Sequence, residues 1–185
     1  MAKMEPAPIA YFEGKYVPAE EARISIMTHA FNYGTGLFEG IRGYYVASEN
    51  NILIFRLKEH VDRMVRNFNI MCMEVPETAE KIEEICIELV KRSGFREGVY
   101  IRPLCYKSEL SLGPKLKGVE SGFCCYVIKL GDYCDIESGL DVAVSSWRRV
   151  SDNAIPTRVK STGSYLNSSL RSEEHTSELQ SRFGI

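Results

Sequence analysis

Near the middle of the chain the sequence reads Val99-Tyr100-Ile101-Arg102-Pro103-Leu104-Cys105-Tyr106. The run is short, it is rich in β-branched and aromatic residues, and a glycine and a lysine bound it, which is typical of a β-strand. Four further segments share this character, namely residues 40–46, 51–57, 122–130 and 140–147. So many strands at close spacing favour an antiparallel sheet.

A hairpin is predicted at the start of that sheet. Two short aromatic and β-branched stretches, at residues 11–12 and 15–17, flank the pair Glu13-Gly14. Glycine accepts the positive φ that a tight turn between two strands requires. We therefore expect the first two strands to be adjacent and antiparallel.

Two amphipathic helices are predicted between the strands. In residues 57–71 the apolar side chains recur at intervals of three and four, which is the period of a helix with one buried face. These apolar residues are Leu57, Val61, Met64, Val65, Phe68 and Met71, and the charged residues Lys58, Glu59, Asp62, Arg63 and Arg66 fall on the other side.

The second helix has start and stop signals of its own. Thr78 suits the N-cap, Lys91 and Arg92 suit the last turn, and Gly94 suits the C-terminal end. Strands with two helices grouped between them predict an α+β fold rather than a doubly wound one.

Composition limits the classes of partner. The 185 residues carry a formal charge of −2 and are 44% hydrophobic, so no basic surface for nucleic acid is expected. No apolar run is long enough to span a membrane, and the first ten residues do not resemble a secretion signal. We expect a cytosolic protein whose partners are small molecules.

The six cysteines are predicted to be reduced core residues. They fall within apolar segments, without a C-x-x-C pair or a histidine cluster. We therefore expect neither a disulfide framework nor a metal site.

The chain is predicted to divide into three parts. Residues 1–135 form a small α+β domain, because Gly131-Asp132-Tyr133-Cys134-Asp135 reads as a polar connection. Residues 136–170 begin a second domain. Residues 171–181 resemble the translation of a sequencing-library adapter, so residues 171–185 are expected to be an artefactual tail on an N-terminal fragment.

Three motifs together suggest a chemistry. Residues 27–42 place three glycines among aromatic residues and include an apparently buried Glu-Arg combination, Glu39 with Arg42; alone they predict a tight loop entering a strand. With Tyr100-Ile101-Arg102-Pro103 and Arg158-Val159-Lys160-Ser161-Thr162-Gly163-Ser164-Tyr165, the chain resembles the branched-chain aminotransferases of the fold-type-IV pyridoxal-phosphate family over residues 10–170. The resemblance implies a small N-terminal domain, with an antiparallel sheet and two helices, and the start of a larger cofactor-binding domain.

The resemblance implies a cofactor role for three residues. Lys160 would be the catalytic lysine that holds pyridoxal 5′-phosphate as a Schiff base and then carries a proton. Arg56 would bind the phosphate, and Tyr165 would hydrogen-bond the phenolic oxygen of the cofactor. Without the resemblance, the same residues would read as a solvated loop lysine, an exposed strand-end charge and a packed core tyrosine.

A substrate pocket is also implied. It is formed by Tyr33, Phe38, Arg42, Tyr100, Arg102 and Tyr133. Aromatic walls suit a branched aliphatic side chain, and Arg102 is expected to meet the second carboxylate of 2-oxoglutarate. Leu130 is a departure, because related bacterial enzymes often carry tryptophan there.

Other motifs are interpreted as structural. His29 and His60 are expected to be hydrogen-bonded loop and helix histidines without metal-ligand spacing. Gly34-Thr35-Gly36 is too short for a nucleotide phosphate loop.

The function implied is transamination of leucine, isoleucine and valine with 2-oxoglutarate, in branched-chain amino acid biosynthesis or degradation, by a homo-oligomer. D-amino-acid aminotransferase, aminodeoxychorismate lyase and a non-catalytic binding module are the alternatives. Because the larger domain supplies the carboxylate at the pyridine nitrogen and further phosphate donors, the 185-residue chain itself is expected to bind the cofactor weakly and to be nearly inactive.

Overall fold

The structure, a computed structural model, describes residues 5–131, 137, 139 and 144–170. Its strands are β1 (Glu5–Pro6), β2 (Ile9–Phe12), β3 (Lys15–Pro18), β4 (Gly36–Phe38), β5 (Ile41–Val46), β6 (Asn51–Ile54), β7 (Val99–Lys107) and β8 (Ser121–Lys129). Its α-helices are α1 (His29–Tyr33), α2 (Leu57–Met71), α3 (Ala79–Ser93) and α4 (Tyr165–Leu170), and its short 3-10 helices are η1 (Ala19–Glu21), η2 (Ala47–Glu49) and η3 (Thr162–Ser164).

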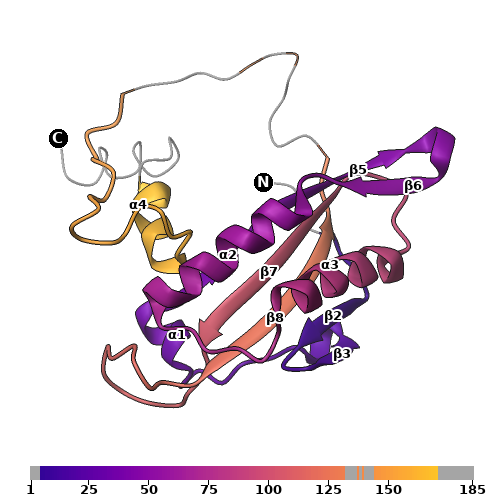
Figure 1. Cartoon of the computed structure of the whole chain (residues 1–185). Helices are drawn as coiled ribbons and strands as arrows, with labels where there is room; N and C mark the ends of the chain where they lie inside the picture. Colours follow the sequence, from indigo (N-terminus) through magenta and orange to yellow (C-terminus); the bar gives the residue numbers. More distant parts are fainter. Residues whose placement is uncertain (1–4, 132–136, 138, 140–143, 171–185) are drawn as a thin grey trace.

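The strands form one antiparallel sheet in the order β3-β2-β8-β7-β5-β6. β1 pairs with β8, and β4 pairs with β7. Two helices lie side by side on one face of this sheet, α2 and α3 (Figure 1). The predicted α+β fold with an antiparallel sheet is therefore confirmed.

β7 is central in the sheet, and its sequence alternates with a period of two. Val99, Ile101 and Cys105 are fully buried, whereas Tyr100 and Arg102 between them are partly exposed. Successive side chains of a strand point to opposite faces, so one face of β7 packs in the core while the other presents Tyr100 and Arg102.

The strand pairing along one side of β7 is interrupted opposite Pro103, between β4 and β5. Phe38 of β4 pairs with Leu104, and Ile41 of β5 pairs with Ile101. Between them, the Glu39 N–H donates to the Pro103 carbonyl at 3.0 Å. Proline has no N–H to offer a ladder, so a break at this point fits its chemistry.

The predicted hairpin is β2 and β3, paired from Ile9 with Pro18 to Phe12 with Lys15. Glu13 and Gly14 both have positive φ, 44° and 86°. Two central residues with positive φ match the right-handed twist of the flanking strands.

Both predicted helices are confirmed, with their ends. α2 spans residues 57–71, and its own residues Val61 and Met64 are fully buried. Thr78 caps α3 by accepting a hydrogen bond from the Lys81 N–H at 3.3 Å. Gly94 ends α3 in the left-handed conformation, at φ 67°.

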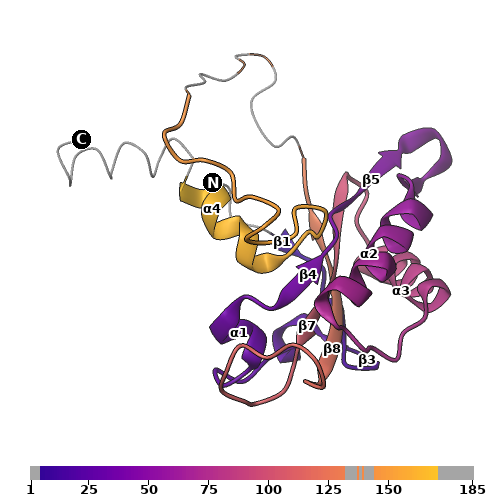
Figure 2. The same ribbon diagram turned by 60° about the vertical axis from the view of Figure 1, so that its left-hand side comes forward.

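The hydrophobic core lies between these helices and the sheet. It is made of residues that recur at helical or strand spacing, including Ile41, Val61, Met64, Ile82, Ile85, Leu89, Val99, Ile101, Phe123 and Val127. Figure 2 shows α4 on the side of β4 away from α2 and α3.

Three expectations about elements need correction. Residues 27–40 contain a helix, α1, and a strand, β4, instead of a loop alone, because five- and three-residue elements are too short to show a period. β6 ends at Ile54, and Arg56 has φ 50°, which is incompatible with an extended strand to residue 57. Residues 144–147 form no strand, and Val144 is exposed; residues 140–143 lie outside the described residues.

The cysteine prediction is confirmed for three of the five that are described. Cys86, Cys105 and Cys125 are free and lie in the core, whereas Cys72 and Cys124 are free but only partly buried. Cys134 and the predicted domain boundary near residue 135 lie outside the described residues.

Candidate functional site

The Lys160 segment is fixed against the glycine-rich run at α1 and β4. The Phe38 N–H donates to the Lys160 carbonyl at 3.1 Å, and the Gly163 N–H donates to the Gly34 carbonyl at 3.1 Å. Gly34 has φ 64°, and a Cβ atom there would lie 2.9 Å from the Cα of Gly163. Gly34 is therefore required for this close approach.

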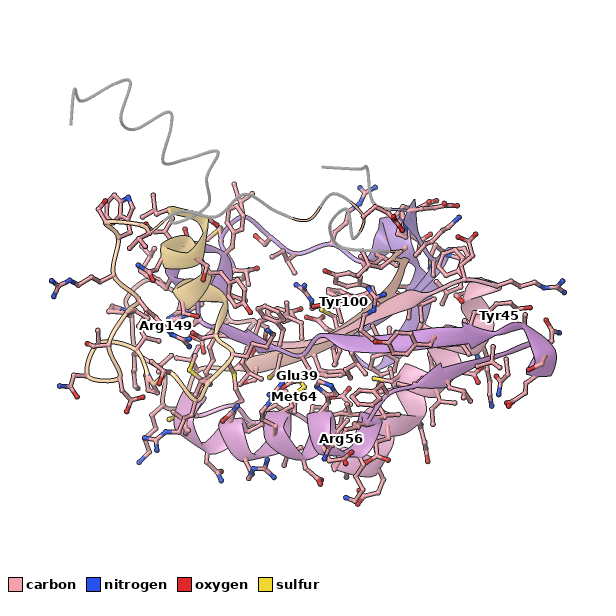
Figure 3. All side chains as sticks on the ribbon, turned by 90° about the horizontal axis from the view of Figure 1, so that it is seen from above. Glu39, Tyr45, Arg56, Met64, Tyr100 and Arg149 are labelled. Carbon is pink, nitrogen blue, oxygen red and sulfur yellow. The ribbon has the colours of Figure 1, made fainter. Side chains whose placement is uncertain are left out.

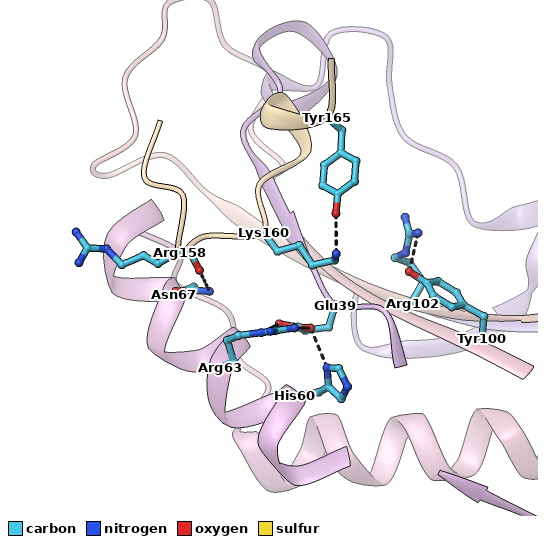
Figure 4. A network of polar contacts seen from close by, with 9 residues as sticks. All are labelled: Glu39, His60, Arg63, Asn67, Tyr100, Arg102, Arg158, Lys160 and Tyr165. Atoms are coloured by element: carbon cyan, nitrogen blue, oxygen red, sulfur yellow. Dashed lines mark hydrogen bonds and ion pairs between the residues drawn. The ribbon is translucent and has the colours of Figure 1, made fainter. Parts of the chain in front are cut away.

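A second anchor comes from the helical side. Val159 is buried in the core. Asn67 of α2 donates its side-chain N–H to the Arg158 carbonyl at 3.3 Å, as Figure 4 shows. Because the chain is held on both sides of Lys160, this lysine projects from a defined backbone although its own side chain is only partly buried.

The Lys160 amine is held among aromatic residues. Its Nζ atom donates a 2.6 Å hydrogen bond to the Tyr165 hydroxyl (Figure 4). The same atom lies 5.0 Å from the centroid of the Phe38 ring, which contacts the Tyr165 ring with centroids 5.0 Å apart. Three predicted site residues therefore meet at one point.

Two further predicted residues join them from β7. The Arg102 guanidinium lies 4.2 Å from the Phe38 centroid and donates to the Tyr100 hydroxyl at 2.9 Å. The Nε atom of Arg102 is buried and has no acceptor among the described residues. Gly40 makes room for this arrangement, because a Cβ atom there would lie 2.1 Å from the Tyr100 hydroxyl oxygen.

A cavity of about 320 Å³ opens beside the Lys160 amine. Its lining includes Lys160, Tyr165 and three arginines, Arg63 of α2, Arg149 and Arg158. Neither Arg63 nor Arg149 belongs to a motif that predicted the site. Four cationic residues around one small cavity make it suited to an anionic ligand that also reacts with an amine.

Glu39 is bonded to the cavity residue Arg63 and is 1% exposed. Arg63 Nε donates to Glu39 Oε1 at 2.6 Å, Arg63 Nη2 donates to Oε2, and His60 Nδ1 contacts Oε2 at 3.0 Å. Burial alone would raise the pKa of Glu39, but the hydrogen bonds from Arg63 and His60 lower it below its usual value. Glu39 also holds the pKa of Arg63 above its usual range.

This geometry corrects the expected Glu39–Arg42 combination. Glu39 pairs with Arg63, whereas Arg42 donates to the Gly131 carbonyl at 3.1 Å. Glu39 lies in the break between β4 and β5 and Arg42 is the second residue of β5, so their side chains are not constrained to meet.

Other predicted site residues are placed elsewhere. Arg56, labelled in Figure 3, pairs with Glu59 at 2.9 Å and is not among the residues that line the cavity. The Tyr33 hydroxyl accepts a hydrogen bond from the Gly113 N–H at 2.8 Å. Tyr133 lies outside the described residues.

The two histidines are hydrogen-bonded, as predicted. His29 is fully buried, with Nδ1 at 2.7 Å from the Thr35 hydroxyl and Nε2 at 2.8 Å from the Gly113 carbonyl. Within the described ranges, no group of His, Cys, Asp and Glu side chains is arranged to hold a metal ion. None of the described helices has the length and apolar character needed to cross a bilayer.

Residues 36–178 match the family described as Amino-transferase class IV. The "Probable branched-chain-amino-acid aminotransferase" of Aquifex aeolicus is 46% identical over 165 residues, which cover 89% of this chain and 53% of that protein. The chain thus spans about half the length of the curated relatives it matches.

Solved structures agree. A branched-chain aminotransferase from Thermoproteus uzoniensis with norvaline superposes with a TM-score of 0.85 at 35% identity, over 93% of this chain and 57% of that one. The T.th. branched-chain amino acid aminotransferase complexed with N-(5′-phosphopyridoxyl)-L-glutamate gives 0.84 at 34% identity, over 95% and 57%. The sheet and helices are those of the fold-type-IV N-terminal domain, and the chain belongs to the amino-transferase class IV family.

Proposed function

We propose that the protein transfers the amino group of leucine, isoleucine or valine to 2-oxoglutarate, with pyridoxal 5′-phosphate as cofactor. The carrying observation is the Lys160 amine, which is hydrogen-bonded to Tyr165 in a cavity that three arginines also line. The names of the similar proteins, which include complexes with norvaline and with a phosphopyridoxyl-glutamate adduct, support this substrate class.

The side chains around the cavity fit the cofactor. An aldehyde needs a primary amine, which Lys160 offers, and a phosphate needs cations, which Arg63 and Arg149 offer within the same 320 Å³. We propose Arg63 for the phosphate in addition to Arg56, whose predicted role rests on the resemblance alone. When bound, pyridoxal phosphate supplies an electron sink that stabilises negative charge at the substrate Cα.

The residues of this chain would then share the remaining work. The Lys160 amine would accept the proton from the substrate Cα and deliver it to the carbon that bore the cofactor's aldehyde. Tyr165 keeps the Nζ atom in place through their 2.6 Å hydrogen bond, and the Phe38 ring shields that atom from water.

Substrate recognition is proposed for Arg102 and the aromatic rings that it contacts. The unpaired, buried Nε of Arg102 is a donor that a carboxylate of 2-oxoglutarate would satisfy. The rings of Phe38 and Tyr100 offer apolar surface to a branched side chain. Roles for Tyr33, Arg42 and Tyr133 stay predictions, as do a homo-oligomer, a biosynthetic role and a cytosolic location.

Trapping tests the cofactor site. The chain is incubated with pyridoxal 5′-phosphate, reduced with borohydride and mapped by peptide mass. We expect a label on Lys160 at concentrations that leave the exposed lysines Lys58 and Lys81 unlabelled, and no label at this position in Lys160→Arg. A label spread evenly over surface lysines would refute the site.

A test of the substrate class needs a chain as long as the relatives. A hybrid joins residues 1–170 to the C-terminal half of the Aquifex aeolicus relative, and its half-reaction is followed with L-leucine and with D-alanine. We expect L-leucine to convert and D-alanine to remain. Preference for D-alanine would instead favour the D-amino-acid aminotransferase alternative.

A further inference from the structure

We propose that Glu39 is a positioning residue of the cavity: it holds the Arg63 guanidinium in the orientation that receives the cofactor phosphate, and His60 fixes Glu39 in turn. The inference rests on the proposed function and deepens it. It assigns a role to a buried carboxylate whose hydrogen-bond partners are Arg63 and His60, not the Lys160 amine.

Glu39 is held in one position by the fold. Glu39 sits in the break between β4 and β5, where its N–H is bonded to the Pro103 carbonyl at 3.0 Å. Its side chain is 1% exposed and lies between the sheet and α2, as Figure 4 shows. A carboxylate so deeply buried is costly unless its oxygens are bonded, and here both oxygens are.

Without Glu39, the Arg63 guanidinium would be free to move. The Arg63 side chain is 47% exposed and has many rotamers in solution. The parallel bonds from Nε and Nη2 to Glu39 form a planar fork that fixes one orientation.

The same fork determines which donors face the ligand. It occupies the Nε–Nη2 edge of Arg63, and none of the described residues accepts a hydrogen bond from Nη1. Since Arg63 lines the cavity, Nη1 is left for an anion there. Glu39 also neutralises part of the Arg63 charge, so Glu39 helps anion binding by orienting the guanidinium and not by increasing its attraction for the anion.

His60 completes the arrangement from one turn earlier on α2. Its Nδ1 contacts Glu39 Oε2, the oxygen that also accepts from Arg63 Nη2. Residues 60 and 63 lie on one helix face, so the helix presents both donors to one carboxylate. His60 thereby limits rotation of the Glu39 carboxylate about its last bond.

The experiment compares two aldehydes that differ only by the phosphate. The half-saturating concentration for borohydride trapping at Lys160 is measured with pyridoxal 5′-phosphate and with pyridoxal. The variants are Glu39→Gln and Asp62→Asn. Asp62 is the matched control, because it precedes Arg63 on α2, is partly exposed and pairs with Lys58 instead.

We expect Glu39→Gln to need about tenfold more pyridoxal 5′-phosphate, since one oriented charged hydrogen bond is lost, with less than about a twofold change for pyridoxal. Asp62→Asn should change neither value by more than about twofold. Equal weakening of both aldehydes in Glu39→Gln, or no change in either, would overturn the positioning role. Failure of the unaltered chain to be labelled at Lys160 would instead refute the proposed function.

A second variant guards against misfolding of Glu39→Gln, which circular dichroism and thermal unfolding would reveal. His60→Gln keeps the Glu39–Arg63 fork and removes only the histidine contact. We expect a smaller weakening, about threefold, that is again confined to pyridoxal 5′-phosphate. If His60→Gln weakens both aldehydes alike, or neither, the role assigned to His60 and Glu39 is wrong.

Discussion

The Lys160 amine donates a 2.6 Å hydrogen bond to the phenolic oxygen of Tyr165, five residues later in the chain. The 3-10 turn η3, residues 162–164, lies between them and leads into α4. The turn reverses the backbone enough for the two side chains to meet on one side of it. The spacing of lysine and tyrosine in this segment therefore has a direct geometric consequence.

Replacing Tyr165 by Phe is expected to slow trapping of pyridoxal 5′-phosphate at Lys160 by about threefold to tenfold, because the amine loses the bond that fixes its position. The ring contact with Phe38 remains, and the side chain is 40% exposed, so the free energy of unfolding should change by less than about 0.5 kcal/mol. The trapping rate is measured by stopping the reaction at timed intervals, and the free energy of unfolding is measured with urea. An unchanged rate would show that the hydroxyl is dispensable.

Acid should weaken the fold through Glu39. Its pKa is lowered in the folded chain from the usual 4.5. The stabilising contribution is thus fully present above about pH 4.5 and is lost as the pH falls through the folded pKa. Urea unfolding is measured at a series of pH values. The free energy of unfolding should fall less with acid in Glu39→Gln than in the unaltered chain. An equal fall in both would contradict a contribution from Glu39.

Lys107 should be a large contributor to stability. It is fully buried, and its Nζ atom donates to the Cys72 carbonyl, to the Val119 carbonyl at 2.9 Å and to the Ser121 hydroxyl at 3.1 Å. Burial lowers the pKa of Lys107. Lys107→Met relieves that burial of charge but leaves two carbonyls without a donor, and we expect a net loss of about 2 kcal/mol.

Urea unfolding compares that variant with Lys115→Met, which removes an exposed lysine from the loop between β7 and β8. The control is expected to stay within about 0.5 kcal/mol of the unaltered chain. Equal stability of the two variants would mean that the Lys107 bonds contribute nothing net.

The cap of α3 gives a simpler test. Thr78→Ala removes the side-chain oxygen that accepts from the Lys81 N–H, and we expect a loss of about 1 kcal/mol in the free energy of unfolding. Thr78→Ser keeps that oxygen and should restore most of the loss. A serine variant as unstable as the alanine variant would assign the effect to packing instead.

Regular elements were predictable because their signals are local. The helical period of residues 57–71, the cap at Thr78 and the glycine at position 94 each act within a few residues, and all three predicted what the structure contains. Strand alternation in β7 likewise separated the core face from the face that carries Arg102. Five-residue α1 and three-residue β4 gave no such period and were missed.

The sequence by itself determined the α+β layout and, through its resemblance to a known family, predicted Lys160, Tyr165, Phe38 and Arg102 as site residues, which the structure brings together. Only the tertiary structure decided which acid and base meet. The helical pattern put Arg63 on the polar side of α2, and the neighbouring motif put Glu39 beside Arg42. Packing of α2 on the sheet instead buries Glu39 against Arg63, 24 residues away, because a buried carboxylate needs whichever cation the fold brings within reach, and sequence spacing carries no record of that distance.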